Sequence, residues 1–192
     1  NFDRLNTVGA KRGEAMGIAL KAEETRDFSP MLGDVTVGLS SGTSGARGMF
    51  LASPEERATW AGTVLARALP RSLLHPQRIA LFLRANSNLY STVGSRRIQF
   101  EFFDLLRPLS EHVEQLNRYQ PTTLVGPASL LRLLAGESDL KIEPEKVIAA
   151  AEVLEPHDAE AISEHFGGLT HQIYQATEGF LGASREDGRV VL

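Results

Sequence analysis

The stretch GLSSGTSGARG, from Gly38 to Gly48, decides the fold and the function expected of this chain. Its eleven positions hold four glycines, four Ser or Thr residues and one arginine, and they follow an apolar run. Glycine lets backbone N–H groups approach an anion closely, and hydroxyl groups add further hydrogen-bond donors. The composition therefore predicts a phosphate-binding loop in which Arg47 supplies a cation. A flexible serine-glycine turn at the surface is the alternative for the same residues.

The overall composition restricts the class of protein. The chain has 192 residues, a formal net charge of −4 and no cysteine. This length is compatible with one globular domain that has its own core, and two small domains stay open as an alternative. Without cysteine, disulfides, thiolate metal sites and a cysteine nucleophile are excluded. The chain has no apolar run long enough for a membrane span, and its acidic balance gives no general attraction to nucleic acid. We expect a cytoplasmic protein with small-molecule partners; its oligomeric state stays open, with a dimer as one possibility.

Apolar strand-like runs alternate with amphipathic helix-like runs along the chain. Strands are expected at residues 35–39, 78–84, 97–103, 122–126, 146–152 and from His171 onward, and helices at 8–26, 53–69, 110–119, 127–136 and 156–166. Ser53 and Glu56 carry the signature of a capping box, and Asp187-Gly188 predicts a hairpin near the end of the chain. The alternation predicts a layered α/β fold, a parallel sheet flanked by helices.

Residues able to bind a ligand follow three of the expected strands. These segments are Ser40–Gly48, Glu152 and Tyr174–Gly179. Open α/β sheets bind their ligands at the carboxyl ends of the strands. We therefore expect all three segments at the ligand-binding edge of the sheet.

The loop carries a resemblance to a known family. SSGTSG, residues 40–45, resembles the phosphate-loop signature of the adenylate-forming superfamily, the acyl-CoA ligases and their relatives. In that family a variable residue, Pro, Lys and Gly follow the core, whereas here ARG (residues 46–48) is one residue shorter and lacks the Pro-Lys pair. The resemblance implies that Arg47 takes over the cationic role, or that this role is lost. It also implies that the loop holds the phosphates of ATP through Ser40, Ser41, Gly42, Thr43, Ser44 and Gly45.

A second segment, YQATEG (residues 174–179), resembles the family's Tyr-Gly-x-Thr-Glu segment, with Gln175 in place of the glycine. The resemblance implies that Tyr174 packs near adenine and that Thr177 approaches the AMP phosphate. It also implies that Glu178 holds Mg²⁺, and Thr43 of the loop is assigned as a second ligand of this ion. Carboxylate and hydroxyl oxygens are suitable ligands for this hard cation. Taken alone, a Thr-Glu pair is more often a helix cap.

A third segment, AAEV (residues 150–153), resembles the family's Gly-Ala-Glu-Pro segment, which places Glu152 beside adenine. The three segments occur in the family's order. Together with LNTVG (residues 5–9), they look most like the phenylacetate-CoA ligase branch, which includes coenzyme F adenylylating synthetases. The fold implied is the central part of the large N-terminal domain of an adenylate-forming enzyme.

The resemblance implies an activity that depends on ATP and Mg²⁺. A carboxylic acid, an aryl acid by analogy with the branch, would be activated as an acyl-adenylate, with CoA as a candidate co-substrate in a second step. No segment matches the family's N-terminal region or its C-terminal domain with the catalytic lysine, so we expect a fragment that does not turn over alone. A non-catalytic module that binds a nucleotide or small molecule on the same fold is the alternative, and a domain without any ligand is a third.

Overall fold

The computed structural model describes residues 2–40, 47–68, 75–86, 94–176, 179–185 and 187–191. The chain forms two compact units, Asn1–Gly62 with Ala85–Val93, and Thr63–Arg84 with Gly94–Leu192. The boundary between them falls within helix α3 (Pro54–Ala68). The assignment of residues 1–192 to a single domain stays a prediction.

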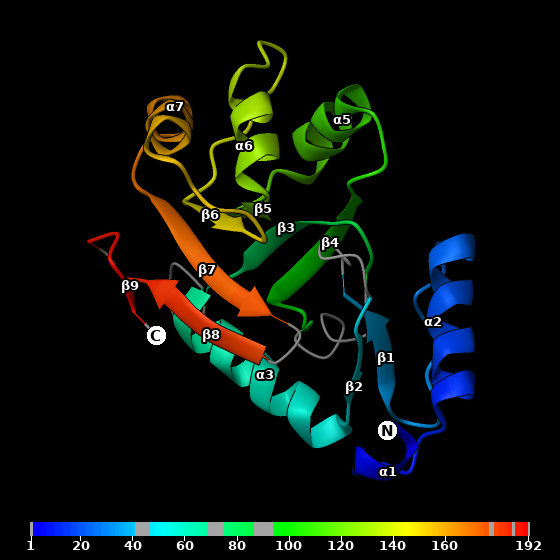
Figure 1. The fold of residues 1–192 in the computed structure, drawn as a ribbon. Helices are drawn as coiled ribbons and strands as arrows, with labels where there is room; N and C mark the ends of the chain where they lie inside the picture. Colours follow the sequence, from blue (N-terminus) through cyan, green and yellow to red (C-terminus); the bar gives the residue numbers. More distant parts are fainter. Residues whose placement is uncertain are drawn as a thin grey trace. The chain divides into compact units, whose positions relative to one another are not determined.

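The first unit contains a two-stranded antiparallel sheet and a helix that covers it. Strand β1 (Thr36–Leu39) pairs with β2 (Met49–Ala52), and the helices that precede them are α1 (Phe2–Leu5) and α2 (Arg12–Thr25). Ala15 and Ala19 of α2 pack with Val37 of β1 in a small apolar cluster, and Figure 1 shows α2 alongside β1. The small side chains of α2 allow this close approach of helix and strand.

Strand β1 does not belong to the parallel sheet. Residues 35–39 were expected in the parallel sheet, and this expectation is wrong, because β1 pairs only with β2 among the described strands. The short apolar run MFLA, residues 49–52, turns back along β1, which places Gly38 opposite Phe50. A methyl group at Gly38 would overlap the Phe50 ring, so glycine lets this ring lie over the partner strand.

The second unit is built on a seven-stranded sheet, counted over the described residues, in the order β4-β3-β5-β6-β7-β8-β9. The first five strands in this order, β4, β3, β5, β6 and β7, are parallel to one another. Strand β8 pairs with β7 in antiparallel orientation, and β9 pairs with β8 in the same way. The strands are β3 (Gln77–Leu83), β4 (Ile98–Asp104), β5 (Thr123–Gly126), β6 (Lys146–Ala150), β7 (Thr170–Ala176), β8 (Gly179–Ser184) and β9 (Val190–Val191).

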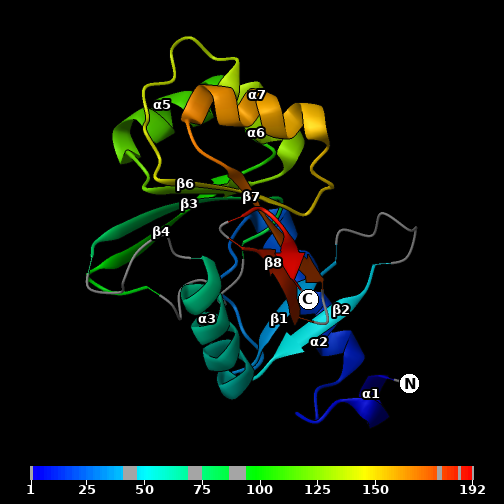
Figure 2. The same ribbon diagram turned by 90° about the vertical axis from the view of Figure 1, so that its left-hand side faces the viewer.

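Three helices cover one face of this sheet. They are α5 (Leu109–Tyr119), α6 (Ala128–Ala135) and α7 (Pro156–Phe166), and they connect β4 to β5, β5 to β6 and β6 to β7. All three connections step in the same direction across the sheet. Because crossovers between parallel strands are right-handed, the three helices must lie on the same face. Figures 1 and 2 show them as one layer against the parallel strands.

The main core lies between this helical layer and the sheet. Phe82 and Phe103 are fully buried there, with their ring centroids 4.8 Å apart, and Leu131 and Leu134 of α6 belong to the same cluster. On the opposite face of β3, Ile79 and Leu81 are also buried. A parallel strand buried on both faces carries a continuous apolar run instead of an alternating one, as residues 79–83 do.

Most expected elements of the second unit, and the start of α3, are confirmed. Helix α7 begins and ends at the predicted residues, α5 begins one residue earlier than predicted, and α6 is one residue shorter than predicted at each end. The capping box of α3 is present: Ser53 N donates to Glu56 Oε2 (2.8 Å), and Glu56 N donates to Ser53 Oγ (3.3 Å). The predicted hairpin at Gly188 joins β8 to β9. No helix in the described part of the chain has the length and apolar character that crossing a membrane requires.

Candidate functional site

The two ends of the expected phosphate loop are joined at the end of the β1–β2 pair. Ser40 N donates to the carbonyl oxygen of Gly48 (2.8 Å), and Gly48 N donates to Ser40 Oγ (2.7 Å). These bonds extend the ladder one step beyond the pair Leu39 and Met49. The loop residues Ser41, Gly42, Thr43, Ser44 and Gly45 lie outside the described residues.

Ser40 and Gly48, joined in this way, form the stem of the loop. Arg47 lies next to Gly48 in this stem, and its guanidinium group binds a carboxylate. Its Nε donates to the carbonyl oxygen of Ser40 (3.1 Å), its Nη1 donates to Glu23 Oε2 (2.7 Å), and its Nη2 donates to Glu23 Oε1. The side chains are 29% and 19% exposed, so the pair is partly shielded from water. The hydrogen bond to Glu23 is the main reason why the pKa of Arg47 is raised. Glu23 lies 24 positions away on α2 and belongs to no motif, so no sequence signal indicated its contact with Arg47.

Glu152 lies just beyond the end of β6 and binds the first turn of a helix. Strand β6 ends at Ala150, two residues before the predicted end, because Ala151 adopts a left-handed conformation with φ of 65°. Residues with a Cβ rarely adopt this conformation. After this change of direction, Glu152 Oε2 accepts a hydrogen bond of 3.0 Å from the backbone N–H of Ser129 in α6.

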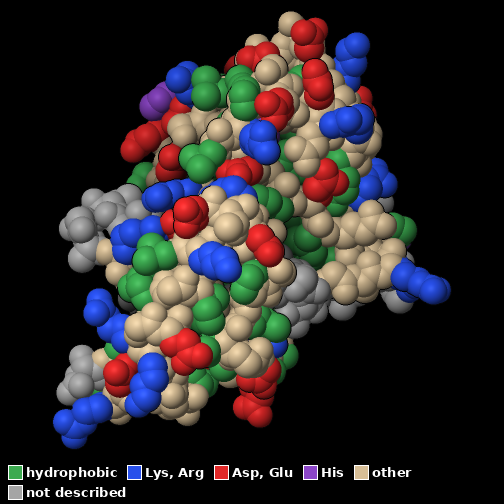
Figure 3. Space-filling model, turned by 90° about the vertical axis from the view of Figure 1, so that its right-hand side faces the viewer, with side chains coloured by type: hydrophobic (Ala, Val, Ile, Leu, Met, Phe, Trp, Pro, Cys, Tyr) green, Lys and Arg blue, Asp and Glu red, His purple; other side chains and the backbone are tan. Residues whose placement is uncertain are grey.

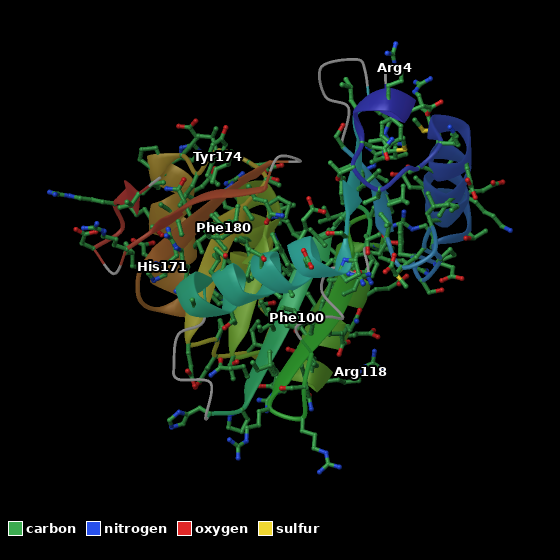
Figure 4. All side chains as sticks on the ribbon, turned by 90° about the horizontal axis from the view of Figure 1, so that it is seen from below. Arg4, Phe100, Arg118, His171, Tyr174 and Phe180 are labelled. Carbon is green, nitrogen blue, oxygen red and sulfur yellow. The ribbon has the colours of Figure 1, made fainter. Side chains whose placement is uncertain are left out.

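Tyr174 is a half-exposed aromatic residue near the end of β7. Its side chain is 55% exposed, and it lies opposite Gly182 of β8. The strand register shifts directly after it, so that Gln175 pairs with Phe180, and Figure 4 labels Tyr174 and Phe180 on the two neighbouring strands. Such bulges redirect side chains and are frequent beside ligand sites.

Thr177 and Glu178, the residues expected at the AMP phosphate and at Mg²⁺, lie outside the described residues. The strands on either side of them are described, and Ala176 of β7 pairs with Gly179 of β8.

The structure brings some of the expected site residues together. Ser40 and Arg47 meet in the first unit. In the second unit, β6 and β7 are parallel neighbours, with Ala150 beside Ile173, so Glu152 and Tyr174 belong to the carboxyl ends of adjacent strands. Their expected position at the carboxyl ends of parallel strands is confirmed, whereas residues 40–48 follow β1 of the separate two-stranded sheet, so the expectation that they follow a strand of the parallel sheet is wrong. An exposed aromatic ring and a carboxylate at such an edge could contact a nucleotide base and its polar atoms.

The surface carries charges of both signs. Among the described residues on the face drawn in Figure 3, Lys and Arg side chains are interspersed with Asp and Glu side chains. This distribution agrees with the net charge of −4.

Comparison with protein-family models and with curated protein sequences finds no match. Solved structures do match the fold. The amide bond synthetase McbA from Marinactinospora thermotolerans aligns with a TM-score of 0.58 and 17% identity, over 79% of this chain and 31% of that chain. ATP-bound MatB from Rhodopseudomonas palustris aligns with a TM-score of 0.58 and 17% identity, over 80% of this chain and 31% of that chain. 2-Hydroxyisobutyryl-CoA ligase in complex with 2-HIB-AMP and CoA aligns with a TM-score of 0.61 and 13% identity, over 87% of this chain and 41% of that chain.

These alignments define the class of fold. The chain has the α/β fold of part of the acyl-CoA and amide ligases, which is the superfamily fold that the loop motif implied. It spans between 31% and 41% of the length of the three ligases compared above.

Proposed function

We propose that this chain forms the nucleotide-binding part of an enzyme that activates a carboxylic acid with ATP. The observation that carries the proposal is the fold shared with ATP-bound MatB over 80% of the chain. In this fold the motif SSGTSG begins at the described stem of Ser40 and Gly48. A phosphate loop requires such closely spaced backbone and hydroxyl donors.

In this proposal the loop binds the triphosphate and the edge of the sheet binds the base. Tyr174 offers its exposed ring to adenine, and Glu152 borders the same group. Thr177 donates a hydrogen bond to the α-phosphate. The phosphate ligands are Ser40, Ser41, Gly42, Thr43, Ser44 and Gly45.

Mg²⁺ would be held by Glu178 and Thr43. Their oxygen donors fit a hard cation that also binds phosphate oxygens. When bound, the ion neutralises part of the negative charge on the phosphates.

The reaction proposed is attack of a carboxylate oxygen on the α-phosphorus of ATP. The new bond forms the acyl-adenylate, and the bond to the bridging oxygen breaks and releases pyrophosphate. Positioning of the two reactants and stabilisation of the developing charge by the loop donors would supply the catalysis. An aryl acid is the proposed substrate, following the phenylacetate-CoA ligase branch, and CoA is the proposed acceptor in a second step that releases AMP.

Exchange of labelled pyrophosphate into ATP tests this function. The intact protein is incubated with Mg²⁺, ATP and a panel of aryl and short-chain carboxylic acids. We expect exchange that depends on one class of acid. Binding of ATP without exchange for any acid would contradict an adenylating enzyme.

The second candidate is a non-catalytic nucleotide-binding module on the same fold. It is favoured by the loop that lacks the Pro-Lys pair and by Arg47, which binds Glu23. This candidate predicts ATP binding without pyrophosphate exchange, so the same experiment separates the two functions.

A further inference from the structure

The stem of the expected phosphate loop is attached to helix α2 through one side chain. Arg47 bridges the carbonyl oxygen of Ser40 and the carboxylate of Glu23. Ser40 and Gly48 are joined by two further hydrogen bonds of 2.8 and 2.7 Å. Both ends of the loop are therefore fixed to each other and to the helix.

The hydrogen bonds of Arg47 decide which role this residue has. An arginine offers five N–H donors in a planar fork, and three of them are used here by Ser40 and Glu23. Its positive charge is compensated by a carboxylate in a pair that is only 29% and 19% exposed. A cation that binds phosphate must instead direct its free charge and its fork at the phosphate oxygens. The geometry favours a structural bond over a phosphate contact.

Helix α2, which carries Glu23, is held in place by packing against β1. Ala15 and Ala19 of α2 are almost fully buried and pack with Val37 of β1. Glu23 follows Ala19 by one turn, so it lies on the part of α2 that continues along the strand pair. The same helix thus contacts β1 through its apolar residues and the loop stem through Glu23.

We infer that Arg47 and Glu23 form a clamp that positions the phosphate loop, and that Arg47 is a positioning residue and not the phosphate-binding cation. The inference rests on the proposed function, since it assumes that the loop binds ATP. Holding both loop ends reduces the conformational entropy that is lost when the intervening residues order around the phosphates. The cationic role of the lysine in the family's phosphate loop is then absent from this loop, and Arg47 does not take it over.

The two roles of Arg47 predict opposite effects when Glu23 is neutralised. If Arg47 is the phosphate cation, Glu23→Gln frees its charge and strengthens ATP binding. If the pair is a clamp, Glu23→Gln loosens the stem and weakens ATP binding. Glu24→Gln is the matched control, because Glu24 is the next residue of α2, is exposed, and loses the same charge.

Titration calorimetry of the intact protein with Mg-ATP measures these effects. For Glu23→Gln we expect the Kd to rise about fivefold, which is roughly 1 kcal/mol, and for Glu24→Gln less than about twofold. Arg47→Lys keeps the positive charge but loses the bidentate fork, so we expect it to weaken binding as much as Arg47→Ala does. The double variant Glu23→Gln/Arg47→Ala should bind no more weakly than Arg47→Ala, because both substitutions remove the same clamp.

Hydrogen exchange of the Ser40 and Gly48 amides in the nucleotide-free protein tests the clamp without ATP. We expect faster exchange of both amides in Glu23→Gln than in wild type and in Glu24→Gln. Tighter ATP binding by Glu23→Gln, full binding by Arg47→Lys, or unchanged exchange of these amides would each overturn the clamp and leave the proposed function intact. A folded wild-type protein that binds no Mg-ATP would overturn the proposed function, while the amide exchange would still decide whether the clamp exists.

Discussion

Glu152 and Ser129 join the carboxyl end of β6 to the first turn of α6 by a hydrogen bond of 3.0 Å. The carboxylate accepts from a backbone N–H that has no partner within its own helix, and its charge is favourable at a helix N-terminus. The left-handed conformation of Ala151 (φ of 65°) precedes it, so a strained residue and a helix cap occur together at the proposed adenine edge.

Glu152→Ala is expected to lower the stability of the protein by about 0.5 to 1 kcal/mol, because the cap of α6 is lost. Glu152→Gln should cost less, since its amide oxygen can still accept from Ser129. Glu155→Ala is the control, because Glu155 precedes α7 without a side-chain cap. Urea unfolding of the three variants measures the differences. Equal effects of Glu152→Ala and Glu155→Ala would show that the bond to Ser129 contributes nothing.

Substitution of two glycines in the first unit should have opposite effects. Gly38→Ala places a methyl group against the Phe50 ring, and overpacking of this kind costs about 1 to 3 kcal/mol. Gly17→Ala on α2 meets no atom within 4 Å and should stabilise the helix by roughly 0.5 to 1 kcal/mol. Thermal unfolding of both variants measures the signs. A second substitution, Phe50→Leu, should restore part of the stability lost in Gly38→Ala, and a failure to do so would contradict the contact.

The elements with strong local signals could be predicted from the sequence. Helix α7 starts at Pro156 and ends before Gly167, and both residues act as local signals for a helix boundary. Strand β2 could not be predicted, because four apolar residues carry no periodicity and their pairing with β1 depends on a contact across the loop. In the site, Glu152 and Tyr174 were expected at the ends of strands, and the parallel pairing of β6 with β7 places them there. The Arg47–Glu23 pair and the left-handed Ala151 result from tertiary packing, for which no motif gives a signal.

Protonation of His112 should make the second unit sensitive to acid. His112 on α5 is 2% exposed, its ring lies 5.1 Å from that of Phe82, and neither ring nitrogen has a hydrogen-bond partner among the described residues. Burial lowers the pKa of His112 below its ordinary value of 6.5, against the opposing charges of Glu111 and Asp104. The folded state therefore favours neutral histidine. As the pH falls below about 6.5, the unfolded chain takes up a proton that the folded protein does not, so stability decreases until the folded-state pKa is reached.

The variant His112→Phe should lose this part of the pH dependence below about pH 6.5, where one proton accounts for up to about 1.4 kcal/mol per pH unit. His75→Gln is the control, because His75 is exposed. Urea unfolding at a series of pH values gives both profiles. Parallel profiles for wild type and His112→Phe would contradict the assignment.

Glu178→Gln should abolish adenylate formation in the intact protein. The amide removes the negative charge that the proposed function assigns to Mg²⁺ binding, and a neutral oxygen is a weaker ligand for this ion. Pyrophosphate release with the preferred acid measures the effect, with Glu164→Gln on the exposed surface of α7 as control. Unchanged pyrophosphate release by Glu178→Gln would remove Glu178 from the site.

Hydrogen exchange of residues 40–48 with and without Mg-ATP tests the central claim that SSGTSGARG is a phosphate loop. The Ser40 and Gly48 amides already donate within the stem in the absence of nucleotide and serve as internal references. We predict that Mg-ATP slows exchange of the amides between them by about tenfold or more, because the β- and γ-phosphates accept several of these donors at once. If ATP binds to the intact protein and these amides gain no protection, the segment is a surface turn and the nucleotide is bound elsewhere.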